Sequence, residues 1–258
     1  MSLKVGARLN NKKIFAIAVA VATAVAIIIL SVSLASKEPP AELYDFGKKV
    51  AQGIDVSEHN SKIDWQTVKS ENEIDFAFIR VGYRGYGSGE ICEDKYAVKN
   101  MKGAKKAGIP FGVYFYSQAI TPEEARAEAR FVAGIIKKYK PQLPVVIDFE
   151  YPTDEEGYHT GRLFEARLTA DESTKIINAF CERIEKSGYT PGLYASSNVI
   201  NNDINTDDID SSVAIWVADY NKKPVTNTKY DIWQYSNTGE INGVKSKYTD
   251  LNYWYKRR

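Results

Sequence analysis

Residues that build redox and metal sites are scarce in this chain, which has two Cys and two His among 258 residues. Cys92 and Cys181 are too few for a disulfide framework, and their positions are compatible with one disulfide or with two free thiols. His59 and His159 stand apart in the sequence without a third or fourth ligand beside them, which argues against zinc. We therefore expect neither a metal nor a cofactor.

The chain also lacks an excess of positive or negative charge, with 34 Lys and Arg against 33 Asp and Glu. Four of the bases lie within residues 1–36, where there is no acid, so the remainder of the chain is slightly acidic. This balance offers no basic stripe suited to nucleic acid, and nucleic acid is not an expected partner. No Gly-x-Gly-x-x-Gly motif follows the first expected strand, which removes the usual support for a dinucleotide-binding fold.

One long hydrophobic run is present, at residues 14–36. About 20 apolar residues span a bilayer, whereas the core of a signal peptide has about 7–15. We expect a transmembrane helix, with a cleavable signal peptide as the alternative because Ser33 and Ala35 are small residues at suitable offsets. The bases that precede the run predict a cytoplasmic segment at residues 1–13 and export of everything after it.

The expected location is therefore the cell membrane, single-pass and with the bulk of the chain extracellular, or the exterior if the run is cleaved. Residues 37–49 contain two adjacent prolines and are typical of an extracellular tether. Residues 50–258 then form one domain that is long enough for a well-buried core.

Strand-like and helix-like segments alternate from residue 50 onward. Capping-box sequences that begin at Thr121 and Thr169 predict the starts of two helices. Alternation of strands with helices favours parallel pairing, and the number of strands favours a barrel. Because the last section has fewer helices, we expect an irregular, TIM-like (β/α) barrel of the α/β class. The expected strands are residues 50–56, 76–81, 111–116, 145–150, 192–194, 214–217 and 231–235.

The most informative segment is Leu143-Pro-Val-Val-Ile-Asp-Phe-Glu150, a branched apolar run that ends in two carboxylates. Because side chains alternate along a strand, Asp148 and Glu150 point to the same face. Such a pair suits cleavage of a glycosidic bond, which needs one protonated and one charged carboxyl. For an isolated pair, capping of a loop or binding of a cation are the alternatives.

Two further acids stand at comparable positions. Asp55 ends the first expected strand, and Asp250 lies at the end of the final section. In β/α barrels the catalytic groups gather at the C-terminal ends of the strands. Four acids from three distant stretches are therefore expected to meet at one mouth, although an Asp near a turn also serves local hydrogen bonds.

Several short motifs follow one another from about residue 50 onward. They are Gly53-Ile-Asp-Val-Ser-Glu-His59, Ile63-Asp-Trp65, Phe78-Ile-Arg-Val-Gly82, Gly112-Val-Tyr-Phe-Tyr-Ser117, Pro144-Val-Val-Ile-Asp-Phe-Glu150, Gly192-Leu-Tyr194, Trp216-Val-Ala218, Trp233-Gln-Tyr235 and Asp250-Leu-Asn252. In kind and order they resemble glycoside hydrolase family 25, the lysozymes of the N-acetylmuramidase type.

This resemblance implies a modified β/α barrel that hydrolyses the β-1,4 bond between N-acetylmuramic acid and N-acetylglucosamine in peptidoglycan. It makes Glu150 the proton donor and places Asp148 beside it as a stabilising or orienting carboxylate. Asp55 and Asp250 complete the acidic cluster, whose negative charge is expected to raise the pKa of Glu150. Two candidates remain for the nucleophile. One is the 2-acetamido group of the substrate, and the other is a water molecule whose attack inverts the anomeric carbon.

Aromatic residues are plentiful, with 17 Tyr and 4 Trp, and sugar faces stack on aromatic rings. Tyr116, Tyr151 and Tyr194 lie at or near strand ends and are predicted to line the sugar groove. Arg80 lies in a buried-looking strand, where it could pair with one of the acids; we name it as a substrate-binding candidate, with a structural role as the alternative. Core packing is the expected role of the mid-strand residues Trp216 and Trp233.

Glycan strands of peptidoglycan are thus the expected partner of a catalytic domain that we expect to be monomeric. A glycan-binding membrane protein that kept the barrel and lost turnover is the alternative, although all four acids are present. A metal-dependent hydrolase on the same barrel is disfavoured by the scarcity of His. The polar loop at residues 151–167 is expected to influence which glycan segments fit.

Overall fold

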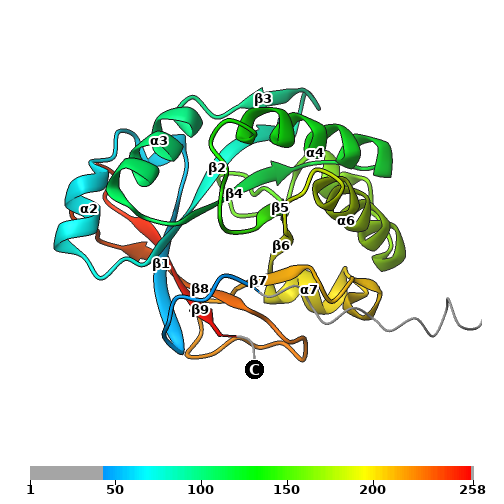
Figure 1. Cartoon of the computed structure of the whole chain (residues 1–258). Helices are drawn as coiled ribbons and strands as arrows, with labels where there is room; N and C mark the ends of the chain where they lie inside the picture. Colours follow the sequence, from blue (N-terminus) through cyan, green and yellow to red (C-terminus); the bar gives the residue numbers. More distant parts are fainter. Residues whose placement is uncertain (1–42, 257–258) are drawn as a thin grey trace, which may run out of the picture. The chain divides into compact units, whose positions relative to one another are not determined.

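Within residues 43–256, the part of the chain that the computed structural model describes, eight strands close into a barrel (Figure 1). Their order is β1-β9-β8-β7-β6-β5-β4-β2, and β2 pairs with β1 again. β9 is antiparallel to both of its neighbours, and the other pairings around the barrel are parallel. The strands are β1 (Val50–Val56), β2 (Phe76–Arg84), β4 (Phe111–Ser117), β5 (Val145–Phe149), β6 (Pro191–Ser196), β7 (Ala214–Ala218), β8 (Ile232–Gly239) and β9 (Thr249–Tyr255), with β3 (Ile91–Glu93) added to β2 outside the barrel.

The expected basic segment 1–13 and the expected membrane span 14–36 lie outside the described residues, as do residues 37–42 of the expected tether. Among the residues that are described, no helix is both long and apolar enough to cross a membrane.

Large aromatic side chains fill the interior of the barrel. Phe78 of β2 stacks on Trp216 of β7 with ring centroids 4.5 Å apart, and it lies nearly parallel to Trp254 of β9 at 6.2 Å. Since these strands are not neighbours in the sheet, the rings meet across the barrel. Trp216 is therefore a core residue, as its position predicted.

Alternate residues of the same strands face the surrounding helices. Ile79 and Val81 of β2 belong to the core between barrel and helices, whereas Phe76 and Phe78 belong to the interior cluster. A strand buried on both sides requires this period of two. α4 packs on α6 (Figure 1). α4 covers β2 and β4, and α6 covers β5 and β6. The helices are α2 (Trp65–Glu71), α3 (Ala97–Ala107), α4 (Pro122–Ile136), α5 (Gly161–Glu165), α6 (Ala170–Glu185) and α7 (Ser197–Asn202), with 3₁₀ turns at η1 (Glu58–Asn60) and η2 (Thr206–Asp208).

The two predicted capping boxes have different outcomes. At α6, Thr169 and Glu172 exchange both hydrogen bonds, so the prediction is confirmed. At α4, the hydroxyl of Thr121 accepts from the backbone N–H of Glu124, but the carboxylate of Glu124 accepts from the backbone of Ile120 instead of from Thr121. The prediction of a full capping box at α4 is therefore wrong. The carboxylate of Glu124 pairs instead with Arg162 from a distant part of the chain.

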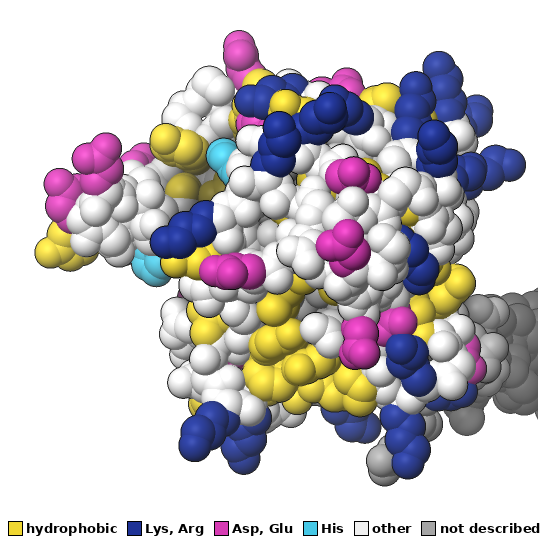
Figure 2. Space-filling view, turned by 90° about the vertical axis from the view of Figure 1, so that its left-hand side faces the viewer, with side chains coloured by type: hydrophobic (Ala, Val, Ile, Leu, Met, Phe, Trp, Pro, Cys, Tyr) yellow, Lys and Arg dark blue, Asp and Glu magenta, His cyan; other side chains and the backbone are white. Residues whose placement is uncertain are grey.

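The predicted irregular barrel is confirmed at its closing section, where β7, β8 and β9 succeed one another without an intervening α-helix. In place of a helix, the rings of Trp233, Tyr235 and Tyr253 pack on one another. Figure 2 views the molecule from the left-hand side of Figure 1 and shows hydrophobic side chains gathered in the lower half of that face. β3 and β9 were not predicted, since β3 is short and β9 carries polar residues on its inner face.

Close approach of two strands requires glycine at position 112. A Cβ there would contact the ring of Phe78 and lie 2.7 Å from the carbonyl oxygen of Pro144. Gly134, on α4, has no heavy atom within 4 Å of the corresponding position.

We predict that Gly112→Ala lowers the free energy of unfolding by about 1–3 kcal/mol, because the packed interior has no room for the methyl group. The control Gly134→Ala is expected to be neutral or to stabilise by up to about 1 kcal/mol, since alanine is the better helix former. Urea unfolding of both variants checks this, and equal stability of the two would contradict the close approach.

Candidate active site

Four acidic side chains line one pocket of about 240 Å³. Asp55 lies near the end of β1, Asp148 lies on β5, and Glu150 follows β5 directly. Asp250 stands near the start of β9 opposite Asp55, because β9 runs antiparallel to β1. The structure thus brings together the four acids named from the sequence, at the barrel end where β/α-barrel enzymes hold their catalytic groups.

Asp55 is buried and accepts two amide hydrogen bonds on one oxygen. Nδ2 of Asn252 donates to Oδ2 at 2.8 Å, and Nε2 of Gln234 donates to the same atom at 2.9 Å. Burial raises the pKa of Asp55, and the hydrogen bonds from Asn252, Gln234 and Asp250 oppose that rise. On balance the pKa of Asp55 stays above its ordinary value. Its hydrogen-bond donors favour the charged form, and the charge of Asp55 raises the pKa values of the other three acids.

The two amides are held in the orientation that Asp55 needs. Nε1 of Trp216 donates to Oδ1 of Asn252 at 2.9 Å. The hydroxyls of Tyr194 and Tyr220 both donate to Oε1 of Gln234 at 2.9 Å. Each amide oxygen is therefore occupied by a donor, which leaves each amino group to face the carboxylate.

Asp250 forms a carboxyl–carboxylate hydrogen bond with Asp55. Burial, followed by the charge of Asp55, raises the pKa of Asp250 to about 8. At neutral pH Asp250 is therefore largely protonated and donates to Asp55.

Asp148 and Glu150 form the second half of the cluster. Burial and then the charge of Asp55 raise the pKa of Glu150 to about 7, and Arg80 partly offsets the rise. Burial and then the charge of Glu150 raise the pKa of Asp148 well above its usual value. Since two neighbouring carboxyls do not ionise together readily, the pair retains a proton near neutral pH.

Arg80 pairs with neither Asp148 nor Glu150. Its Nε donates to Asp94 at 2.9 Å, and its Nη2 donates to Glu58 at 3.3 Å. These direct contacts are with acids outside the pocket, and a role of Arg80 in binding substrate stays a prediction. Its positive charge nevertheless opposes the rise in the pKa values of Asp148 and Glu150 from a distance.

The three tyrosines named for the sugar groove lie in different surroundings. Tyr194 lines the pocket. Tyr116 is half-buried near the acids, and burial followed by the charges of Glu150 and Asp148 raises its pKa. Tyr151 instead packs against the rings of His159 and Phe164 in the loop after β5. Substrate contact by these three residues stays a prediction.

Comparison with known proteins gives the family. The family model described as glycosyl hydrolases family 25 matches residues 54–244, which is most of the chain. The chain belongs to this family. The matched residues include Asp55, Asp148 and Glu150 and end before Asp250.

Relatives of this family 25 chain are found in several bacteria. The uncharacterized protein YegX of Escherichia coli K12 is 28% identical over 200 residues, covering 74% of this chain and 65% of YegX. The autolysin LytC of Streptococcus pneumoniae, solved in complex with a synthetic peptidoglycan ligand, is 29% identical with a TM-score of 0.68, covering 80% of this chain and 47% of LytC. A family 25 glycosyl hydrolase from Bacillus anthracis is 27% identical with a TM-score of 0.63, covering 86% and 96% of the two chains. The chain therefore spans about two thirds of the length of YegX and about half that of LytC.

Sequence reasoning missed the polar residues that hold Asp55 in this family 25 site. A signal was present at Asn252, because it shares a strand face with Asp250 two positions earlier. Trp216 was assigned to the core, and it is both buried and part of the pocket wall. The further lining residues that were not named as site residues are Tyr114, Tyr220, Gln234 and Asn237.

Of the two alternatives for the cysteines, one disulfide or two free thiols, the structure contains two free thiols. Cys181 is buried. Within residues 43–256, no group of three or more His, Cys, Asp or Glu is arranged to hold a metal ion. Independence of metal remains a prediction for experiment.

We predict that Glu150→Gln stabilises the protein in a pH-dependent way. The folded-state pKa of Glu150, about 7, lies above its ordinary value of 4.5. Its contribution to stability is therefore present at low pH and is lost as pH rises through about 7. Glutamine does not titrate and so avoids this loss. Relative to the native chain, the free energy of unfolding of Glu150→Gln is therefore expected to be higher at pH 8 than at pH 4 by on the order of 1–3 kcal/mol.

Urea unfolding at several pH values measures this difference. Glu71→Gln, at the exposed end of α2, is the matched control for loss of one carboxylate. A difference between Glu150→Gln and the native chain that did not grow with pH would contradict a raised pKa at this site.

Proposed function

We propose that this protein hydrolyses the β-1,4 glycosidic bond between N-acetylmuramic acid and N-acetylglucosamine in peptidoglycan. Membership of family 25 supports glycoside hydrolysis, and the LytC complex with a synthetic peptidoglycan ligand supports the substrate class. The observation that carries the proposal is the pairing of a carboxyl of pKa about 7, Glu150, with a hydrogen-bonded carboxylate, Asp55, in one polar pocket.

Glu150 serves as the general acid in this proposal. A catalytic acid works best when its pKa lies near the working pH, since it then holds a proton and can still release it. The pKa of Glu150, about 7, meets that condition. Because Glu150 directly follows the strand and lines the pocket, its proton can be delivered to the leaving oxygen of a bound glycan.

Asp148 serves as the orienting carboxyl group, and its pKa is raised by burial and by the charge of Glu150. It is buried, it lines the pocket, and its Oδ1 has no hydrogen-bond partner among the residues described. In this proposal an N–H of the 2-acetamido group donates to the exposed part of the Asp148 carboxyl group, and the oxygen of the same acetamido group attacks the anomeric carbon. This route retains the anomeric configuration, whereas direct attack by water inverts it, and NMR of the first products distinguishes the two.

Asp55 and its partners stabilise the positive charge that develops on the sugar. Negative charge already fixed in place before the reaction needs no reorganisation in the transition state. Asp250 shares its proton with Asp55 and so moderates that charge. Tyr116, Tyr151 and Tyr194 offer rings and hydroxyls to the glycan, while Arg80 tunes the acids through its charge.

We predict that Glu150→Gln lowers the rate of peptidoglycan hydrolysis at least about 10²-fold, because general acid catalysis contributes about that much or more. The native protein is expected to release reducing ends of N-acetylmuramic acid at an unchanged rate in EDTA. Its kcat/KM is expected to fall as pH rises above about 7, where Glu150 loses its proton. Mass spectrometry of the reduced products and a pH–rate profile measure these outcomes.

Glu71→Gln is again the control and is expected to retain native activity. Binding of peptidoglycan without any product would instead favour a non-catalytic glycan receptor on the same barrel. Loss of activity in EDTA would favour a metal-dependent hydrolase, and full activity of Glu150→Gln would exclude Glu150 as the acid.

We further propose that residues 14–36 anchor the protein in the cell membrane with the barrel outside, or act as a signal peptide. The apolar run and the four bases before it support this location. Such an anchor restricts hydrolysis to wall material near the membrane.

We predict that the full chain stays with membranes after washing in high salt and carbonate, because a spanning helix is held by its apolar surface. A variant lacking residues 1–36 is the comparison. Determination of the N-terminus of the mature protein separates anchor from signal peptide, and a full-length chain found free of membranes would contradict the anchor.

A further inference from the structure

The ladder between β4 and β5 stops one residue before Glu150, at the pair formed by Ser117 and Phe149. Beyond that pair, the side chain of Gln118 bridges the two strand ends. Its Nε2 donates to the carbonyl oxygen of Ser117 at 2.9 Å and to the carbonyl oxygen of Glu150 at 3.0 Å. Since carbonyl oxygens only accept, the amino end of the amide must face them.

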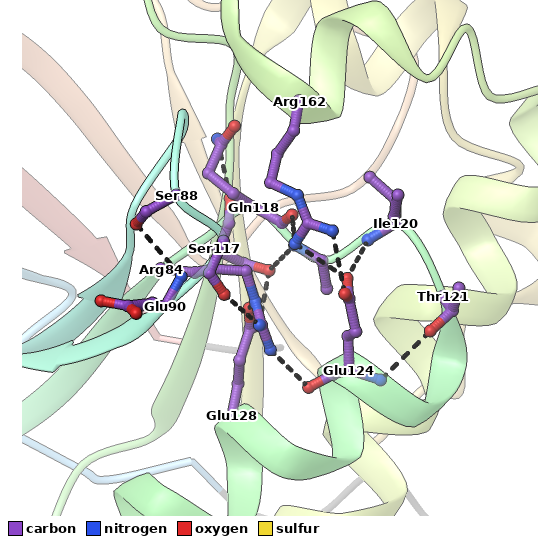
Figure 3. Close-up of polar contacts among 12 residues, drawn as sticks. Arg84, Ser88, Glu90, Ser117, Gln118, Ile120, Thr121, Glu124, Glu128 and Arg162 are labelled. Atoms are coloured by element: carbon purple, nitrogen blue, oxygen red, sulfur yellow. Dashed lines mark hydrogen bonds and ion pairs between the residues drawn. The ribbon is translucent and has the colours of Figure 1, made fainter.

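Hydrogen bonds from α4 and α5 fix the main chain on both sides of Gln118 (Figure 3). Ser117 Oγ donates to Oε2 of Glu128 at 2.6 Å and accepts from the backbone N–H of Ala119 at 3.2 Å. Nη1 of Arg162 donates to the carbonyl oxygen of Gln118 at 3.2 Å. The turn after β4 is therefore held by a residue of α4 on one side and a residue of α5 on the other.

Glu128 is fully buried and shares its carboxylate between Ser117 and Arg84. Nε of Arg84 donates to Oε1 of Glu128 at 2.6 Å, and its other nitrogens donate to the carbonyl oxygens of Gly89 at 2.7 Å and Glu124 at 3.2 Å. A buried ion pair with all these hydrogen bonds resists separation, because loss of one partner leaves the other charge buried and unpaired. Burial raises the pKa of Glu128 to about 7, and the hydrogen bonds from Ser117 and Arg84 oppose this rise. The pair supports the turn through these hydrogen bonds and carries full charge on both partners only above that pH.

Arg162 and Glu124 form the second ion pair of the cluster. Nη2 and Nη1 of Arg162 donate to the two carboxylate oxygens of Glu124 at 2.9 and 3.0 Å. The backbone N–H of Arg162 donates to the carbonyl oxygen of Tyr86, which adds the turn between β2 and β3. The cluster thus docks α5, in the loop that follows Glu150, onto α4.

We propose that Gln118 is a positioning residue for Glu150, held in place by the ion pairs of Arg84 with Glu128 and of Arg162 with Glu124. Glu150 lies past the last strand pair, so its main chain needs another restraint. A catalytic group displaced by about 1 Å can lose about 10²-fold in rate, which gives this restraint a function. The inference rests on the proposed role of Glu150 as the general acid.

We predict that Gln118→Met, which keeps the length of the side chain and removes the donor, lowers kcat on peptidoglycan about 10- to 100-fold. KM is expected to stay within about threefold, because Gln118 does not line the pocket. The alkaline limb of the pH–rate profile is expected to move to lower pH, since a loosened Glu150 is better hydrated. Steady-state kinetics across pH measure all three quantities.

Asn100→Leu is the matched structural control. Asn100 is a buried amide of α3 whose Oδ1 accepts from Nε1 of Trp65 at 3.4 Å, away from the pocket. Its loss is expected to lower stability and to leave kcat and the pH limb unchanged. Equal losses of kcat in Gln118→Met and Asn100→Leu, or native kinetics in Gln118→Met, would overturn the proposal.

Arg162→Lys is the second variant if Gln118→Met does not fold, since lysine keeps the charge and loses the two-pronged contact with Glu124. A fall in kcat of about three- to tenfold with the same shift of the pH limb is expected, and native kinetics would overturn the role of the cluster.

If the native protein shows no activity on peptidoglycan, the proposed function is overturned, but the restraint of Glu150 by Gln118 is not. In that case the restraint is tested by urea unfolding across pH. The native chain is compared with Glu150→Gln, and Gln118→Met is compared with the double variant Gln118→Met and Glu150→Gln. In Gln118→Met the pH at which Glu150 titrates is expected to be lower than in the native chain, and an unchanged titration would overturn the restraint itself.

Discussion

One negative charge organises the pocket. Burial raises the pKa of Asp55, and the two amide groups and the carboxyl that donate to it oppose this rise by favouring its charged form. That charge in turn raises the pKa of Asp250 and Glu150, so the protonation of the whole cluster follows from a single carboxylate. Removal of its amide donors would redistribute the protons among all four acids rather than alter one residue.

The donors to Asp55 depend on how the barrel closes. β9 enters between β1 and β8 in the antiparallel direction, so its inward-facing residues meet the end of β1. An ordinary parallel eighth strand would place its first residues at the opposite end of the barrel. The irregular closure is therefore what brings Asp250 and Asn252 to Asp55, and the fold and the site share this one departure from regular geometry.

Local patterns in the sequence were sufficient for much of the architecture and for the four acids. The strand that ends in Asp148 and Glu150 was predictable because apolar period and side-chain alternation are properties of a few adjacent residues. The direction of β9 was not, since strand order depends on contacts across the whole chain. Gln234 stands in the motif Trp233-Gln-Tyr235, but its role was not predicted for a related reason: the function of a glutamine in a strand is not apparent until its partner is known. The same limit explains Glu124, whose expected cap was replaced by a partner 38 positions away.

Closure by β9 also has a consequence for biosynthesis. The strand that completes the barrel is made after every other strand, and its partner β1 is made first. Pairing across nearly the whole domain is slow, because a long loop must close before the contacts form. An unfinished chain lacks both the last wall of the barrel and the amide of Asn252 that holds Asp55. The chemistry of the pocket therefore becomes available only when synthesis of the domain is complete.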